Sequence, residues 1–152
     1  MRIQTHRGWA RGARAMLFLL GMSCLVLHAQ ASTDIDMPMP LQGLSGSAER
    51  GRALVGNKQQ SLCLLCHQGP FPEDRFQGNL APNLTQSAQR LGASQLRARI
   101  VDASQFNPQT IMPPYYRTEG LYRVTPSLKG QPILSAQEIE DVIAFLVSLK
   151  QP

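Results

Sequence analysis

The sequence is poor in the residues that build metal and redox sites, because its 152 residues include only three cysteines and three histidines. Beyond residue 31 these reduce to Cys63, Cys66 and His67. A structural zinc site needs four ligands at a suitable spacing, so this scarcity argues against one. A thioredoxin-like dithiol is disfavoured as well, since the βαβ pattern that carries such a motif is missing. The sequence also lacks alternating apolar and polar runs and internal repeats, which argues against β-sheet and repeat architectures.

The beginning of the chain has the composition of a secretory signal peptide. Arginines precede an apolar run over residues 16–27, and an Ala-Gln-Ala sequence offers a cleavage site after residue 31. The run is shorter than the ~20 residues of a membrane-spanning helix, which disfavours the alternative of an uncleaved anchor. Cys24 would suit a lipoprotein, but the apolar run continues past it. We therefore predict a cleaved signal peptide over residues 1–31 and a secreted protein without a membrane anchor.

The remaining chain is nearly neutral. Four arginines and no acidic residue leave with residues 1–31, so the formal net charge falls from +5 to +1. The basic stripe of a nucleic-acid-binding surface is not visible, and we predict no nucleic-acid partner. Residues 32–46 are rich in proline, methionine and glycine and predict an extended or mobile lead-in. Residues 47–152 are long enough for one compact domain.

The motif that carries chemistry is Cys-Leu-Leu-Cys-His over residues 63–67, the C-x-x-C-H signature of c-type haem attachment. The two thiols add across the haem vinyl groups, and the two residues between them let one backbone turn present both sulfurs to the same edge. His67 then lies under the iron as the proximal ligand. We predict one covalent haem c held by Cys63 and Cys66, which leaves no thiol for a disulfide or a covalent sulfur intermediate.

Three helices are predicted around this motif, and the fold class is all-α with long loops. Ser47 can cap a helix that runs to about Val55, and residues 94–103 have apolar positions at helical spacing. The last helix is the clearest, because Ser135 and Glu138 form a capping box before a continuous apolar stripe. Long loops are expected over the proline-bearing residues 69–82 and around Met112.

Met112 is the preferred sixth ligand of the iron. A second histidine is excluded because His6 and His28 leave with the signal peptide, and Met37 and Met39 lie in the lead-in. Met112 precedes two prolines, which stiffen the backbone and can hold the thioether toward the iron at little entropic cost. The alternative is a methionine that only fills a gap in the core. Met/His ligation raises the reduction potential and closes the iron to oxygen, which disfavours a gas sensor.

Several other polar positions have two interpretations each. The carbonyl of Pro82 could orient His67, or Pro82 could be a plain loop residue. Tyr115 and Tyr116 could bind a haem propionate, although packing with wet hydroxyls is preferred. Arginines in the middle of the chain could pair with propionates or an acidic partner, although a solvated helix face is preferred. These are Arg90, Arg97 and Arg99.

In this order the features resemble class I c-type cytochromes, over about residues 47–150. The resemblance implies the class I cytochrome c fold, with helices and long loops wrapped around one covalent haem. It further implies that the first and last helices cross near Gly51 and Phe145, and that the Pro82 carbonyl accepts a hydrogen bond from His67.

A closer resemblance lies in residues 97–102, 107–116, 120–124, 130–138 and 140–146 of the second half. This similarity is to the SoxX family, the monohaem cytochrome subunits of SoxAX complexes in bacterial sulfur oxidation. It implies a periplasmic heterodimer with a SoxA-like cytochrome subunit, which joins thiosulfate to a cysteine of a SoxYZ-like carrier protein. In that family the reactive cysteine lies on SoxA, so this chain would be the electron-accepting subunit of an L-cysteine S-thiosulfotransferase. A free-standing periplasmic electron shuttle, serving a downstream acceptor, is the alternative function.

Overall fold

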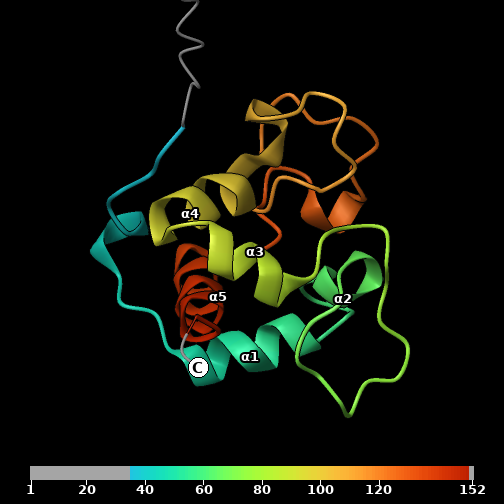
Figure 1. Ribbon diagram of the computed structural model, residues 1–152. Helices are drawn as coiled ribbons and strands as arrows, with labels where there is room; N and C mark the ends of the chain where they lie inside the picture. The colour runs from blue at the N-terminus through green and yellow to red at the C-terminus, as the bar shows by residue number, and fades with distance from the viewer. Residues whose placement is uncertain (1–34, 151–152) are drawn as a thin grey trace, which may run out of the picture. The chain divides into compact units, whose positions relative to one another are not determined.

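The computed structural model describes residues 35–150, and within them every regular element is helical (Figure 1). The predicted signal peptide, residues 1–31, lies outside the described residues. The all-α prediction is confirmed for the described part of the chain. Its α-helices are α1 (Ala48–Gly56), α2 (Cys63–Cys66), α3 (Leu84–Arg90), α4 (Ala93–Asp102) and α5 (Ala136–Ser148). Three 3-10 turns are η1 (Leu41–Gly43), η2 (Ala103–Gln105) and η3 (Pro126–Leu128).

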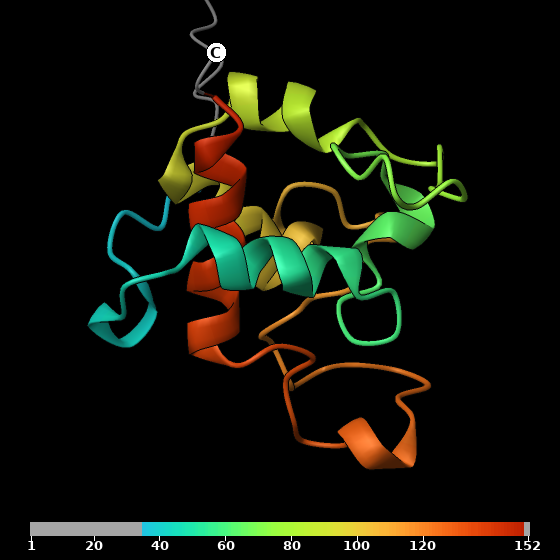
Figure 2. The same cartoon turned by 90° about the horizontal axis from the view of Figure 1, so that it is seen from below.

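Helices α1 and α5 cross in direct backbone contact (Figure 2). Their contact point is Gly51, where a Cβ atom would lie 1.9 Å from the carbonyl oxygen of Asp141 and 2.9 Å from the Cβ of Phe145. Both helices begin as the sequence predicts. The Ser47 hydroxyl accepts a hydrogen bond from the backbone of Arg50, and Ser135 forms the capping box of α5. The expected crossing near Gly51 is therefore present.

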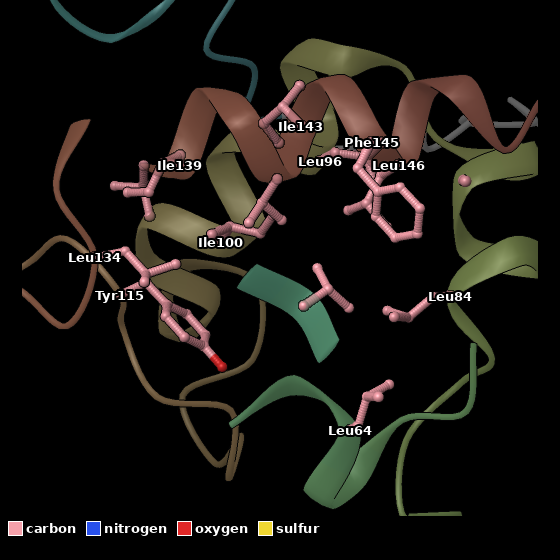
Figure 3. Close-up of a cluster of buried hydrophobic side chains, with 14 of the residues drawn as sticks. Leu64, Leu84, Leu96, Ile100, Tyr115, Leu134, Ile139, Ile143, Phe145 and Leu146 are labelled. Atoms are coloured by element: carbon pink, nitrogen blue, oxygen red, sulfur yellow. The ribbon is translucent and has the colours of Figure 1, made fainter. Parts of the chain in front are cut away.

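The stripe of apolar residues on α5 forms the centre of the core (Figure 3). Its side chains pack against Leu96 and Ile100 of α4, and against single residues from loops and short helices. The contributors from these other segments include Leu64, Leu84, Tyr115 and Leu134. Figure 3 shows the Leu64 and Leu84 side chains on the side of the cluster that lies across from α5. No helix among residues 35–150 is long and apolar enough to cross a membrane.

Arg97 corrects the expectation of a solvated helix face. It is 4% exposed, and its guanidinium donates two hydrogen bonds to Glu140 of α5, at 2.7 and 2.8 Å. A third hydrogen bond goes to the carbonyl oxygen of Met37 at 2.6 Å, and Glu140 also accepts one from the backbone of Leu41. The described part of the lead-in therefore packs over α4 and α5, and it buries a charge that the helix periodicity alone places outside.

Helix α3 is not predicted by the sequence pattern. Asn83 caps it by accepting a hydrogen bond from the backbone of Thr85 at 2.9 Å. Only Leu84 and Ala88 are buried in its seven residues, so it offers too few apolar positions for a recognisable period. It follows the proline-bearing loop over residues 69–82, which is present as a loop without regular structure.

Candidate haem site

Helix α2 holds the two cysteines of the C-x-x-C-H motif one turn apart. Its first residue follows Leu62, which has a left-handed backbone (φ 61°), and the buried Leu64 fixes the helix on the core. Positions three apart on a helix lie on the same face, so Cys63 and Cys66 point to one side. Both are free and partly accessible, and burial raises the pKa of the Cys63 thiol.

The loop over residues 69–82 folds back onto α2. The backbone of Gly78 donates to the carbonyl of Leu64 at 2.8 Å, and that of Ala81 donates to Cys66 at 3.0 Å. Gly78 lies so close that a Cβ atom would meet the Leu65 carbonyl oxygen at 2.1 Å. A glycine here thus permits the loop to run against the attachment helix and to bring Pro82 beside His67.

The Nδ1 atom of His67 lies 2.6 Å from the carbonyl oxygen of Pro82. This contact matches the one that the sequence analysis expects. A ring N–H that donates to a backbone carbonyl fixes the orientation of a metal-binding histidine and leaves its Nε2 as the coordinating atom. The geometry suits a proximal ligand, and the ligand role of His67 itself stays a prediction.

Two adjoining cavities of about 390 and 620 Å³ meet at this site. The predicted site residues Cys63, His67, Pro82 and Met112 line both cavities, and so does Tyr115. The fifth predicted site residue, Cys66, lines only the larger cavity. The structure therefore brings together all five predicted site residues, although Met112 is 45 positions from His67 in the chain.

The chemistry of this lining fits a haem group. The smaller cavity is enclosed mainly by aliphatic side chains from α3, α4 and α5, which suit the face of a porphyrin. The paired thiols lie at its boundary with the larger cavity, together with one imidazole and one thioether. Two thiols could form the carbon–sulfur attachments of a c-type haem, and the imidazole and the thioether are the pair of iron ligands used in cytochromes c.

Tyr115 is a site residue whose role the sequence does not reveal. Its side chain is 4% exposed, and its hydroxyl donates to the carbonyl oxygen of Ser61 at 2.5 Å and lies 3.9 Å from the Cys63 sulfur. Burial, and to a lesser extent the neighbouring thiol, raise the pKa of Tyr115 well above its usual value, so the hydroxyl keeps its proton. Tyr115 is a buried packing residue, as the sequence predicts, but its hydroxyl bonds to a backbone carbonyl and is not open to solvent. Tyr116 instead accepts a hydrogen bond from Gln42 at 3.3 Å.

Two arginines also line the smaller cavity. Arg99 is partly buried, with its guanidinium 4.1 Å from the ring centre of Phe106, and Arg90 is exposed. Neither is within ion-pair distance of a carboxylate in the described part of the chain. The preferred interpretation of a solvated helix face does not place these arginines at the cavity. No signal in the sequence shows that Arg99 lines the cavity whereas Arg97 pairs with Glu140.

Comparisons with known proteins agree with this site. The family model of cytochrome c matches residues 48–150. Among solved structures, a chain of the crystal structure of SoxXA from P. pantotrophus is similar, with a TM-score of 0.70 and 33% sequence identity. The match covers 78% of this chain and 92% of that chain. No curated protein matches.

These matches confirm the class I cytochrome c fold and the single haem c attached through Cys63 and Cys66. The family match includes the attachment motif and all five described α-helices, each of which contributes residues to the lining of the smaller cavity. The chain therefore belongs to the cytochrome c family, and its similarity to SoxXA supports a haem cytochrome of the SoxX type.

Proposed function

We propose that the chain is the electron-accepting subunit of a periplasmic complex with a SoxA-like cytochrome. In this complex, thiosulfate is joined oxidatively to a cysteine of a SoxYZ-like carrier protein. The observation that carries the proposal is the similarity to a chain of SoxXA, combined with a cavity that His67 and Met112 both line. The predicted signal peptide over residues 1–31 would deliver a chain whose residues 47–152 form the cytochrome domain.

His67 and Met112 would hold the iron, and the bound haem would supply one-electron exchange at a potential raised by thioether ligation. The Pro82 carbonyl keeps the His67 ring oriented. The aliphatic lining would limit the access of water to the haem face, and solvent access is one of the factors that set the reduction potential. With Met112 as the second iron ligand, the haem would have no open position for oxygen.

The cysteine inventory supports the division of labour between two chains. Cys63 and Cys66 are consumed by haem attachment, and Cys24 falls in the predicted signal peptide. The mature chain would then have no thiol to carry a sulfur adduct, so the reactive cysteine must lie on the partner or the carrier. One haem accepts one electron at a time, and the two-electron oxidation of sulfur requires a second acceptor or a second transfer.

The rim of the larger cavity is suited to electron transfer from the haem to a partner protein. Exposed apolar residues rim it beside the attachment helix, namely Leu65 (51% exposed), Leu80 (72%) and Ile111 (75%). An uncharged rim around a haem edge suits close approach of a partner, because few charged groups need to be desolvated.

A pull-down of the full chain from thiosulfate-grown cells, followed by haem staining and mass spectrometry, tests the proposal. A SoxA-like cytochrome should co-purify, and deletion of the chain should abolish thiosulfate-dependent haem reduction. A chain that stays monomeric, with thiosulfate-dependent reduction intact in the deletion strain, would instead indicate a free-standing electron shuttle.

A further inference from the structure

In the described part of the chain, the side chain of Tyr115 alone hydrogen-bonds the Met112 loop (residues 107–116) to the haem-attachment segment (residues 57–67). The backbone of Tyr115 is itself fixed at two points. Its N–H donates to the carbonyl of Ile100 at the end of α4, and its carbonyl accepts from Leu134 just before α5, both at 3.1 Å. The Tyr115 side chain thus extends from a backbone position that two hydrogen bonds fix, three residues after Met112.

The carbonyl of Ser61, which accepts the hydrogen bond of the Tyr115 hydroxyl, belongs to a residue that is also held in place. Ser61 is fully buried, and its hydroxyl contacts the carbonyl of Asn57 at 3.3 Å, where α1 ends. The next residue, Leu62, makes the left-handed turn into α2, and Cys63 follows. A hydrogen bond of 2.5 Å between Tyr115 and the Ser61 carbonyl therefore connects the base of the Met112 loop to the residue two positions before the first thioether.

The Met112 side chain packs against the core, and the other constraints on its backbone are local. Its N–H donates to the Thr110 hydroxyl at 3.1 Å, and Pro113 and Pro114 limit the backbone, but the preceding Ile111 is 75% exposed. In the described part of the chain, Tyr115 alone supplies a side-chain hydrogen bond between residues 107–116 and residues 57–67. The Tyr115 hydroxyl therefore makes the side-chain hydrogen bond that connects these two described segments.

We propose that Tyr115 is a positioning residue, whose hydroxyl holds the Met112 thioether on the iron by fixing its loop to the segment that carries Cys63. This inference rests on the proposed ligand role of Met112. Loss of the hydroxyl leaves the Ser61 carbonyl buried without its donor and lets the loop move away from the attachment segment. The fraction of molecules with a displaced thioether then rises, while the remainder of the fold is retained.

Imidazole binding to the oxidised, haem-loaded full chain measures that fraction. Imidazole competes with Met112 for the iron, so its apparent affinity is proportional to the fraction of molecules in which the thioether has moved away. The Tyr115→Phe variant should bind imidazole roughly three- to tenfold more tightly than the parent, the change that one net hydrogen bond produces. The weak near-infrared sulfur-to-iron band should also disappear at a lower imidazole concentration.

Two control variants separate positioning from general stability. Tyr116→Phe removes the neighbouring hydroxyl, which bonds to Gln42 of the lead-in, and should leave imidazole affinity at the parent value. Ile143→Val weakens the core on α5 at a residue that does not line the haem cavity, and it should lower denaturant resistance without tightening imidazole binding.

Parent-like imidazole affinity in Tyr115→Phe would overturn the inference, and so would an equal increase in Ile143→Val. If Tyr115→Phe does not accumulate with haem, 4-aminophenylalanine at position 115 keeps a weaker donor and should shift affinity in the same direction by a smaller factor. An unchanged affinity there also refutes the positioning role. Failure of the ligand assignment is distinguishable, because the parent itself would then lack the sulfur-to-iron band.

Discussion

Gly51 of α1 and Asp141 of α5 approach so closely that no side chain fits between them. A Cβ atom on Gly51 would lie 1.9 Å from the Asp141 carbonyl oxygen, a backbone atom that cannot turn aside. Val55 of α1 and Val142 and Leu146 of α5 line the smaller cavity, so this crossing also positions part of the cavity wall.

Replacement of Gly51 by serine should therefore lower the free energy of unfolding by about 1–3 kcal/mol or more, since the helices must separate to admit the side chain. Gly92→Ser is the matched control. Its Cβ would meet its nearest neighbour at 3.8 Å, and serine is a preferred residue at the start of a helix such as α4. Denaturant unfolding of the two haem-loaded variants checks this, and equal stability would contradict the steric argument.

The buried pair of Arg97 and Glu140 should be far more sensitive than an exposed pair. Glu140→Gln leaves the Arg97 guanidinium, 4% exposed, without its counter-charge, and it should cost about 3–5 kcal/mol in the free energy of unfolding. Glu73→Gln breaks the exposed pair with Arg52 and should cost much less, because solvent screens that interaction. Parallel urea titrations compare them, and similar losses would show that the burial of the first pair is unimportant.

The features of the fold that the sequence predicts are those specified by neighbouring residues. The attachment motif lies within five consecutive residues, and the cap of α5 needs only Ser135 and Glu138. The apolar stripe of α5 repeats within single turns of one helix. Each of these patterns is complete inside one window of sequence, so no knowledge of tertiary packing is needed to interpret it.

The features that escape prediction depend on distant segments. Arg97 is buried because it bonds to Glu140 and to the carbonyl of Met37, which lie 43 and 60 residues away in the sequence. The Tyr115 hydroxyl is occupied by Ser61, which lies 54 residues away and presents only a backbone carbonyl. Every residue has a backbone carbonyl, so the amino-acid sequence does not show which carbonyl accepts this hydrogen bond.

Asp141 should make the fold sensitive to acid. Burial alone would raise the pKa of Asp141, but hydrogen bonds from Arg50, the Ser47 backbone and Gln137 outweigh it, and the pKa is lowered. A lowered pKa means that the carboxylate stabilises the fold above its ordinary value of about 4, and that this contribution is lost as the pH falls through the folded-state pKa.

Asp141→Asn should accordingly reduce the free energy of unfolding at pH 7, and its difference from the parent should narrow between about pH 5 and pH 2. Chemical denaturation across this range measures the gap. Glu119→Gln, at an exposed position without an ion pair to another described residue, should follow the parent at every pH. A gap for Asp141→Asn that is independent of pH would exclude the carboxylate charge as its cause.

Arg99 should raise the reduction potential of the haem. Haem carries two propionates at the edge opposite its vinyl groups, so attachment through Cys63 and Cys66 would place that edge away from α2. Arg99 lines the cavity without a carboxylate partner in the described part of the chain, so it is suited to face a propionate. A positive charge near the iron favours the reduced state.

Arg99→Gln should lower the potential by an amount on the order of tens of millivolts, as measured by redox titration. Arg75→Gln removes an exposed charge that lines a different cavity and should change the potential less. Equal shifts in the two variants would indicate a general effect of net charge, and would argue against a specific position for Arg99 beside the haem.

Met112→Ala should abolish the weak near-infrared sulfur-to-iron band and lower the reduction potential, because a thioether stabilises the reduced iron relative to harder ligands. Met39 is 73% exposed, so Met39→Ala is the matched control and should retain both properties. Met37 packs partly against the core, and its carbonyl accepts from Arg97. A band that survives in Met112→Ala would therefore move the ligand to the lead-in, and the spectra of Met37→Ala and Met39→Ala would then decide which methionine reaches the iron.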